Sequence, residues 1–216
     1  MAGIAIYDIE TGPLPLENIE AFLPKREAPT NYGEEAAAKY VARHRKKDIE
    51  KAALSAMTGK VLAIGYLHPD DQLEILECDA DEATLLRAFW AYFTRDVIHQ
   101  RIHTFGFNNL DFDLPFLLTR SQTLDVLETV PPEVLNYHKF RYYSDHHHDI
   151  RNLLFGELAK ASLGTVANFF GTKHQKSGQG KDFAELWATN KQAAREYCAN
   201  DIRVTEDVVR KVWQLN

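Results

Sequence analysis

Short apolar runs that alternate with turn residues predict the strands of this chain. Residues 3–9 (GIAIYDI) are apolar and β-branched enough for a buried strand, which we expect to end at Thr11-Gly12-Pro13. Residues 61–67 and 72–78 flank the turn sequence HPDD and predict a β-hairpin. Two further strands are expected at 102–107 and 147–150.

Apolar residues at helical spacing predict a second set of elements. We expect helices at 82–94, 111–121, 152–159, 162–170 and 182–215. Residues 34–56 have an Ala-rich, charged composition with a thin apolar stripe, which is typical of a peripheral helix. Strands first, followed by helices interleaved with strands, indicate an α/β fold with a mixed sheet.

Length and charge fit one domain with an elaborated segment. The 216 residues predict a single domain spanning 1–216, with a Pro-rich and helical insertion at about 13–60. The formal net charge is −6, yet residues 25–60 carry nine Lys and Arg against five Asp and Glu. A basic arm on an acidic body is therefore one interpretation, and a solvated helix face is the other.

Several protein classes are disfavoured by what the sequence contains. Cys78 and Cys198 do not form a CxxC pair and cannot supply a four-cysteine zinc site, so we expect reduced thiols, with one disulfide left open. The apolar runs are too short to span a bilayer, and no basic segment precedes a long apolar one. We expect a cytoplasmic protein that does not associate with a membrane.

Several carboxylates stand at positions that the spacing of apolar residues assigns to the core. Asp8 and Glu10 stand two apart at the end of the first strand and share one face, unless the strand has already left the sheet there. On the last helix, Asp201 shares a face with Tyr197 and with Val204 and Val208, which we expect to lie in the core. The alternative is that Asp201 forms an ion pair with an arginine from elsewhere in the fold. Asp113 stands near the start of a helix for which Asp111 would suffice as a cap.

These segments together resemble the three motifs of the DEDD superfamily of 3′→5′ exonucleases. YDIET (7–11) is similar to the first motif, NNLDFD (108–113) to the second and YCAND (197–201) to the third, in the expected order. Glu196 stands where one subclass has histidine, whereas Tyr197 matches the tyrosine subclass (DEDDy). The exonuclease domain of family B DNA polymerases is the group that the chain resembles best, which implies an α/β, ribonuclease-H-like mixed β-sheet flanked by helices.

The resemblance also implies a set of catalytic roles. Asp8, Glu10 and Asp201 would hold the ion that binds the attacking water, and Asp8 with Asp113 would hold a second one. Tyr197 would orient that water rather than act as a strong base, since its ordinary pKa is near 10. Oxygen ligands favour Mg²⁺ or Mn²⁺ over zinc.

Contacts to the substrate are expected around the first two motifs. Backbone amides could meet the terminal nucleotide, amide side chains could bond sugar or phosphate, and an aromatic ring could stack on a base. The residues are Thr11, Gly12, Asn108, Asn109 and Phe112, and Asn109 departs from the Gly that related proteins often have.

Basic and histidine-rich segments carry further expectations. The cluster RHRKK (43–47) could contact successive phosphates of a nucleic acid. The loop 171–181, with Lys176 and Lys181, is predicted to contact the nucleic-acid strand. His146-His147-His148-Asp149 is interpreted as structural, because consecutive residues of a strand point to opposite faces. Asp149 is expected to cap or brace the helix that follows.

The function implied is metal-dependent 3′→5′ hydrolysis of single-stranded DNA from its 3′ end, with release of nucleoside monophosphates and two divalent ions as cofactors. A ribonuclease-D-like exoribonuclease and a non-catalytic nucleic-acid-binding module remain as alternatives. The presence of all four acids and the tyrosine favours an enzyme over the binding module. The sequence does not predict an oligomeric state.

Overall fold

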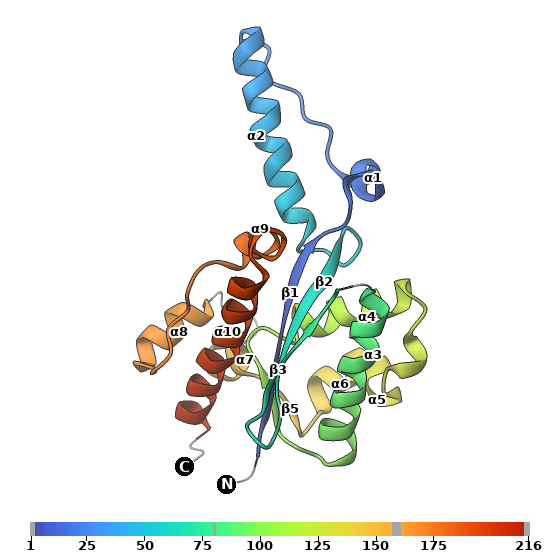
Figure 1. Ribbon diagram of the computed structural model, residues 1–216, viewed down its shortest axis with the longest axis vertical. Coiled ribbons are helices and arrows are strands. Elements are labelled where there is room, and N and C mark those ends of the chain that lie inside the picture. The colour runs from blue at the N-terminus through green and yellow to red at the C-terminus, as the bar shows by residue number, and fades with distance from the viewer. Residues whose placement is uncertain (1–2, 80, 157–160, 214–216) are drawn as a thin grey trace.

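A five-stranded mixed sheet forms the centre of the computed structural model, which describes residues 3–79, 81–156 and 161–213 (Figure 1). The strand order is β3-β2-β1-β4-β5, with β1, β2 and β3 antiparallel and β4 and β5 parallel to β1. The strands are β1 (Ala5–Pro13), β2 (Gly59–Leu67), β3 (Leu73–Glu77), β4 (Thr104–Gly106) and β5 (His147–Asp149). The mixed sheet flanked by helices confirms the predicted ribonuclease-H-like fold class.

Helices cover both faces of this sheet (Figure 1). One face packs against α8 (Leu163–Phe170), α9 (Phe183–Thr189) and α10 (Lys191–Val212), and the other against α3 (Glu82–Phe93) and α4 (Asp113–Thr123). The other α-helices of the described residues are α1 (Leu16–Ile19), α2 (Glu34–Ala52), α5 (Pro132–Leu135), α6 (Tyr137–Tyr143) and α7 (Ile150–Phe155). None of the described helices combines the length and apolarity needed to cross a bilayer.

The alternation of side chains along β1 decides which face receives its carboxylates. Tyr7 and Ile9 pack in the core beneath α3 and α4, whereas Ile6 packs in the core beneath α10. Because neighbours on a strand point to opposite faces, Asp8 and Glu10 project toward α10.

The first strand is longer than the sequence predicts. Thr11, Gly12 and Pro13 continue the pairing with β2 after a register irregularity between Glu10 and Thr11. The expectation that these three residues end the strand was therefore wrong. The irregularity accommodates one extra residue of β2 between the partners of Glu10 and Thr11. Pro13 is tolerated because it is the last residue of the strand.

Two predicted helix boundaries also differ in the structure. The single helix expected over 182–215 is divided at Asn190, whose side chain accepts a hydrogen bond from the Ala193 amide and so caps α10; residues 214–216 lie outside the described residues. Asp111 does not cap α4, because its carboxylate instead pairs with Arg141 (2.6 Å) and with Arg151. Positions 157–159 of the helix expected at 152–159 also lie outside the described residues.

Asp149, at the end of β5, joins two segments through its carboxylate. It accepts hydrogen bonds from the amides of Arg151 (2.9 Å) and Asn152 (3.2 Å), which confirms the expected cap of α7. It also accepts from the amides of Asn108 (3.0 Å) and Leu110 (3.1 Å) in the loop before α4. One buried side chain therefore fixes the loop that carries the second acidic motif.

Helix α2 projects from the end of the sheet as an arm (Figure 1). The irregular chain before it is tied to the helix by a pair between Arg26 and the buried Asp48 (2.5 Å) and by a pair between Arg45 and Glu20. The helix ends at Ala52, four residues earlier than expected. Assignment of residues 13–60 as an insertion stays a prediction.

Replacement of Asp149 tests the link between β5, α7 and the loop before α4. We expect Asp149→Ala to lower the free energy of unfolding by about 2–4 kcal/mol, because four backbone amides lose their acceptor. Asp81→Ala is the matched control: Asp81 caps α3 through the amides of Ala83 and Thr84 and the neighbouring Thr84 hydroxyl, without a link to a second segment, so its loss should cost about 1 kcal/mol. Equal losses in chemical denaturation would contradict the role given to Asp149.

Candidate metal centre

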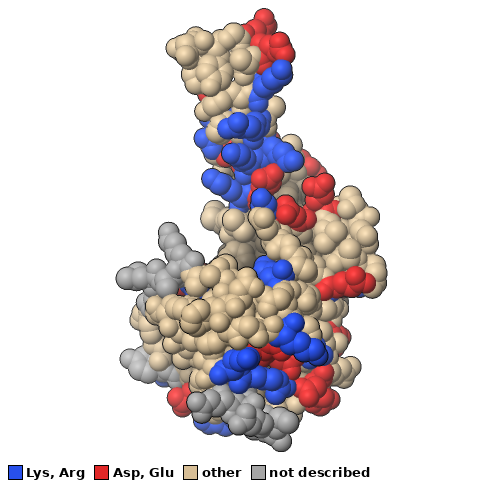
Figure 2. All heavy atoms as spheres, turned by 90° about the vertical axis from the view of Figure 1, so that its left-hand side faces the viewer, with Lys and Arg blue, Asp and Glu red and all other residues tan. Residues whose placement is uncertain are grey.

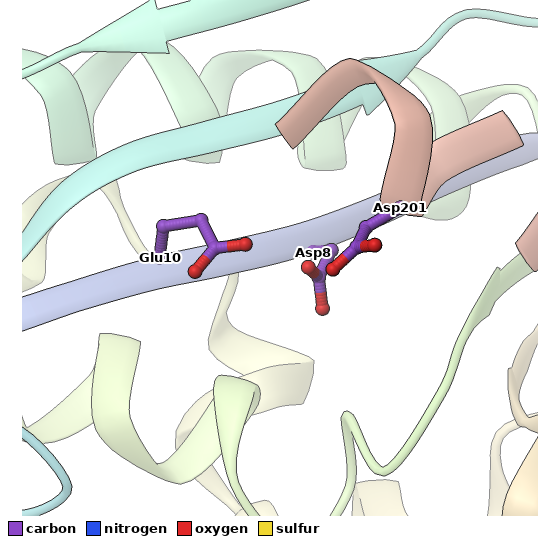
Figure 3. Close-up of side chains that lie close together, drawn as sticks. All are labelled: Asp8, Glu10 and Asp201. Atoms are coloured by element: carbon purple, nitrogen blue, oxygen red, sulfur yellow. The ribbon is translucent and has the colours of Figure 1, made fainter. Parts of the chain in front are cut away.

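Three carboxylates from two distant segments converge beside the sheet. Asp8 and Glu10 on β1 and Asp201 on α10 each offer an oxygen, and these oxygens all lie within 4.8 Å of one another (Figure 3). The alternation of β1 and the core-facing stripe of α10 bring them together, since Val204 and Val208 anchor the same helix face in the core. The structure therefore shows Asp8 and Glu10 on one face of β1, and Asp201 and Tyr197 on the core-facing side of α10, as the spacing predicts.

The cluster is electrostatically costly on its own. Glu10 is 6% exposed and Asp201 is 2% exposed. Burial, together with the charge of Asp201, raises the pKa of Asp8 to about 7. Burial and the neighbouring carboxylates also raise the pKa of Glu10 well above its usual value. Like charges at this spacing favour either protonation or a bound cation.

A lysine supplies positive charge to the cluster. The Lys176 ammonium pairs with Asp201 and lies 4.9 Å from the centre of the Tyr197 ring. It opposes the rise that burial causes in the pKa of Asp201. Lys176 belongs to the loop 171–181, whose contact with a nucleic-acid strand stays a prediction; here its ammonium compensates the charge of the buried Asp201.

The remaining polar atoms suit a divalent cation. Asp201 Oδ1 and the Tyr197 hydroxyl are buried and have no hydrogen-bond partner among the described residues. Carboxylate oxygens are the ligands that hard cations such as Mg²⁺ and Mn²⁺ take, and the cluster offers three of them. The residues present therefore fit a divalent metal ion.

Asp113 lies beside this cluster but does not join its closest group. The pairing of β1 with β4 ends at Ile6, so the next residues of β1 have no strand on that side in the described part of the chain. There the Asp113 Oδ1 accepts a hydrogen bond from the Ile9 amide (2.9 Å). The side chain is 3% exposed, and burial followed by the charge of Asp8 raises its pKa. Asp113 therefore lies against β1 and lines the same pocket as the three carboxylates.

A pocket of about 350 Å³ opens over the acids. The predicted site residues that line it are Asp8, Glu10, Thr11, Asn108, Phe112, Asp113, Tyr197 and Asp201. Arg151 also lines it, with a buried Nε that has no partner among the described residues. Arg151 stands outside the three motifs, so no sequence signal predicts it as a site residue. The pocket thus combines acidic, aromatic and basic groups.

Two predicted substrate contacts are not brought to this pocket. A Cβ at Gly12 would lie 2.6 Å from Leu62 Cδ1, so this residue packs against the neighbouring strand. Asn109 is fully buried, and its Nδ2 approaches His147 (3.2 Å). The left-handed backbone at Asn108 (φ 67°) places Asn109 inside the fold, which corrects the expectation that Asn109 meets sugar or phosphate.

The histidine segment is structural among the described residues. His147 is buried and shares a hydrogen bond of 2.8 Å with the Tyr7 hydroxyl, and His148 contacts His103 at 2.8 Å. Burial lowers the pKa of His147 to about 3, so the ring stays neutral. These contacts agree with its interpretation as a packing element.

This fold and acidic site define a nuclease-like class, and comparisons with known proteins specify it. A family model described as a predicted 3′-5′ exonuclease related to the exonuclease domain of PolB matches residues 51–208. The chain belongs to this family. The matched span contains Asp113, Tyr197 and Asp201, whereas Asp8 and Glu10 precede it.

A solved structure supports the same fold over nearly the whole chain. The family B DNA polymerase from the hyperthermophilic archaeon Pyrobaculum calidifontis is similar with a TM-score of 0.62 and 19% identity. The likeness covers 99% of this chain and 25% of the polymerase chain, so the protein corresponds to about a quarter of that polymerase. No curated protein matches the sequence significantly.

Removal of the Lys176 charge tests the electrostatics of the cluster. Without metal at pH 8, we expect Lys176→Met to lower the free energy of unfolding by about 2 kcal/mol, because the carboxylates lose their counter-charge. Saturating Mn²⁺ should then raise the melting temperature of the variant more than that of the wild type. Lys173→Met, an exposed position on the same loop, is the control; identical behaviour of the two variants would refute the role of Lys176.

Proposed function

We propose that this protein is a 3′→5′ exonuclease that hydrolyses single-stranded DNA from its 3′ end and releases nucleoside monophosphates. The observation that carries the proposal is the meeting of Asp8, Glu10 and Asp201 within 4.8 Å, in a pocket that Asp113 and Tyr197 also line. Membership of an exonuclease family supports the same reaction.

The four acids would hold two divalent ions, Mg²⁺ or Mn²⁺. Asp8, Glu10 and Asp201 form the main group, and Asp113 approaches from the edge of β1 next to Asp8. When bound, such ions make water a nucleophile at neutral pH and neutralise charge on the phosphate and the leaving 3′ oxygen. The chain itself supplies the oxygen ligands; burial raises their pKa values, and a bound cation would favour their ionised form.

Tyr197 would orient the attacking water as a hydrogen-bond donor. It lies one helical turn before Asp201, so both side chains face the pocket, and its hydroxyl has no partner among the described residues. Burial and the nearby carboxylates raise its pKa above the usual value, which keeps the hydroxyl protonated. This position also supports assignment to the tyrosine subclass.

The rest of the pocket would hold the terminal nucleotide. Phe112 offers a partly exposed ring on which a base can stack, while Thr11 and Asn108 offer polar groups for sugar and phosphate. Arg151 pairs with Asp111 and also lines the pocket, so its guanidinium is placed to meet a phosphate oxygen there.

Substitution of the acids tests the reaction. On a 5′-labelled DNA oligonucleotide with Mn²⁺, we expect Asp8→Asn and Asp201→Asn to lower kcat by about 1,000-fold or more, because each removes a metal ligand. Tyr197→Phe should lower it by about 10- to 100-fold through loss of one hydrogen bond. Asp207→Asn, on the same helix but paired with His174, should retain activity.

The same assay defines the substrate and the direction. A ladder that shortens from the 3′ end, with faster cleavage of DNA than of RNA of the same sequence, is the expected result. Full activity of both acid variants would refute the proposal. Faster cleavage of RNA than of DNA would instead identify the protein as an exoribonuclease.

A further inference from the structure

The arm carries a basic stripe that the proposed active site does not use. Arg43, Lys46, Lys47 and Lys51 stand at i, i+3, i+4 and i+8 on α2 and therefore share one face of the helix. Among the described residues, none of these four lies within 4.0 Å of a carboxylate, in contrast to Arg45, which pairs with Glu20. Figure 2 shows Lys and Arg side chains following the arm toward the body of the molecule.

This stripe borders a groove of about 820 Å³ between α2 and the start of α9. Lys46, Lys47 and Lys51 lie along one wall, and Lys181 stands on the opposite side. In all, five Lys and Arg line the groove against three Asp and Glu, although the whole chain is acidic. The groove is thus a local positive site on a negative protein.

The groove also has an apolar floor. Ile49, Ala53 and Leu54 from the end of the arm face Ala184 of α9 across it. Leu54 is 62% exposed and therefore presents an apolar side chain to a ligand in the groove. Apolar surface flanked by lysines matches a ligand with flat apolar groups on an anionic backbone.

The groove is continuous with the acidic pocket. Thr11, Leu54 and Gly180 line both, so one path leads from the carboxylates to the basic stripe. An exonuclease that holds the 3′-terminal nucleotide over its acids must direct the rest of the strand, which lies 5′ of that nucleotide, out of the pocket. The shared residues mark this exit.

We propose that the groove between α2 and α9 binds the single-stranded segment immediately 5′ of the nucleotide in the acidic pocket; this inference rests on the proposed function. Lys46, Lys47 and Lys51 contact phosphates, and the bases lie against Ile49 and Leu54. A duplex would keep its bases stacked inside and leave the apolar floor uncovered, so an unpaired strand of DNA or RNA is the better fit.

The salt dependence of binding tests the groove without any cleavage. The probe is a fluorescent oligothymidylate of about 20 nucleotides in EDTA, and the variant is Lys46→Gln/Lys47→Gln. Loss of two phosphate contacts should reduce the slope of log Kd against log salt concentration by about 1.4, and raise Kd by about tenfold at low salt. Lys139→Gln/Lys211→Gln, with the same change in net charge on the body, should keep the wild-type slope.

A second readout compares substrates of different length. For Lys46→Gln/Lys47→Gln, the ratio of kcat/KM for the long oligonucleotide to kcat/KM for a dinucleotide should fall by about tenfold, because the dinucleotide does not reach the groove. An unchanged slope, an equal loss on both substrates, or tighter binding of duplex than of single strand would overturn the proposal. Failure of the wild type to cleave with any ion would reject the proposed function, while the binding slope would still decide the groove.

Discussion

Mutual repulsion among buried carboxylates is the constraint around which this molecule is organised. Asp8 is half-buried and lies within 4.8 Å of the buried Glu10 and Asp201, which disfavours three free anions, and desolvation already raises the pKa of Asp8 to about 7. Lys176 relieves part of this cost. A fold that assembles such a cluster from its central strand and its last helix favours a ligand of higher positive charge.

The surrounding structure holds the acids in place with few interactions. Packing of Val204 and Val208 fixes the face of α10 that carries Asp201, and the alternation of β1 fixes Asp8 and Glu10. The Ile9 amide holds Asp113 at the strand edge, and Asp149 holds the loop before it. Rigid elements therefore supply the proposed metal ligands, whereas loops and the α2 arm supply the surfaces proposed to meet nucleic acid.

Much of this arrangement is predictable from the sequence, because periodicity encodes which face a residue occupies. The shared face of Asp8 and Glu10, the inward direction of Asp201, and the cap at Asp149 all follow from strand or helix spacing. Asn109 is buried rather than exposed in the pocket, and no local pattern predicts the left-handed backbone of Asn108 before it. Arg151 and the pairing of Lys176 with Asp201 depend on tertiary contacts between distant segments, which no local pattern reports. The extension of β1 through Pro13 likewise depends on its pairing with β2.

Anomalous diffraction from a crystal grown with Mn²⁺ tests the central claim most directly. The account predicts a manganese peak within bonding distance, about 2.0–2.3 Å, of oxygens from Asp8, Glu10 and Asp201, with the Lys176 ammonium moved away from Asp201. An ordered crystal with saturating Mn²⁺ that shows no peak between these carboxylates, and Lys176 still paired with Asp201, would contradict it.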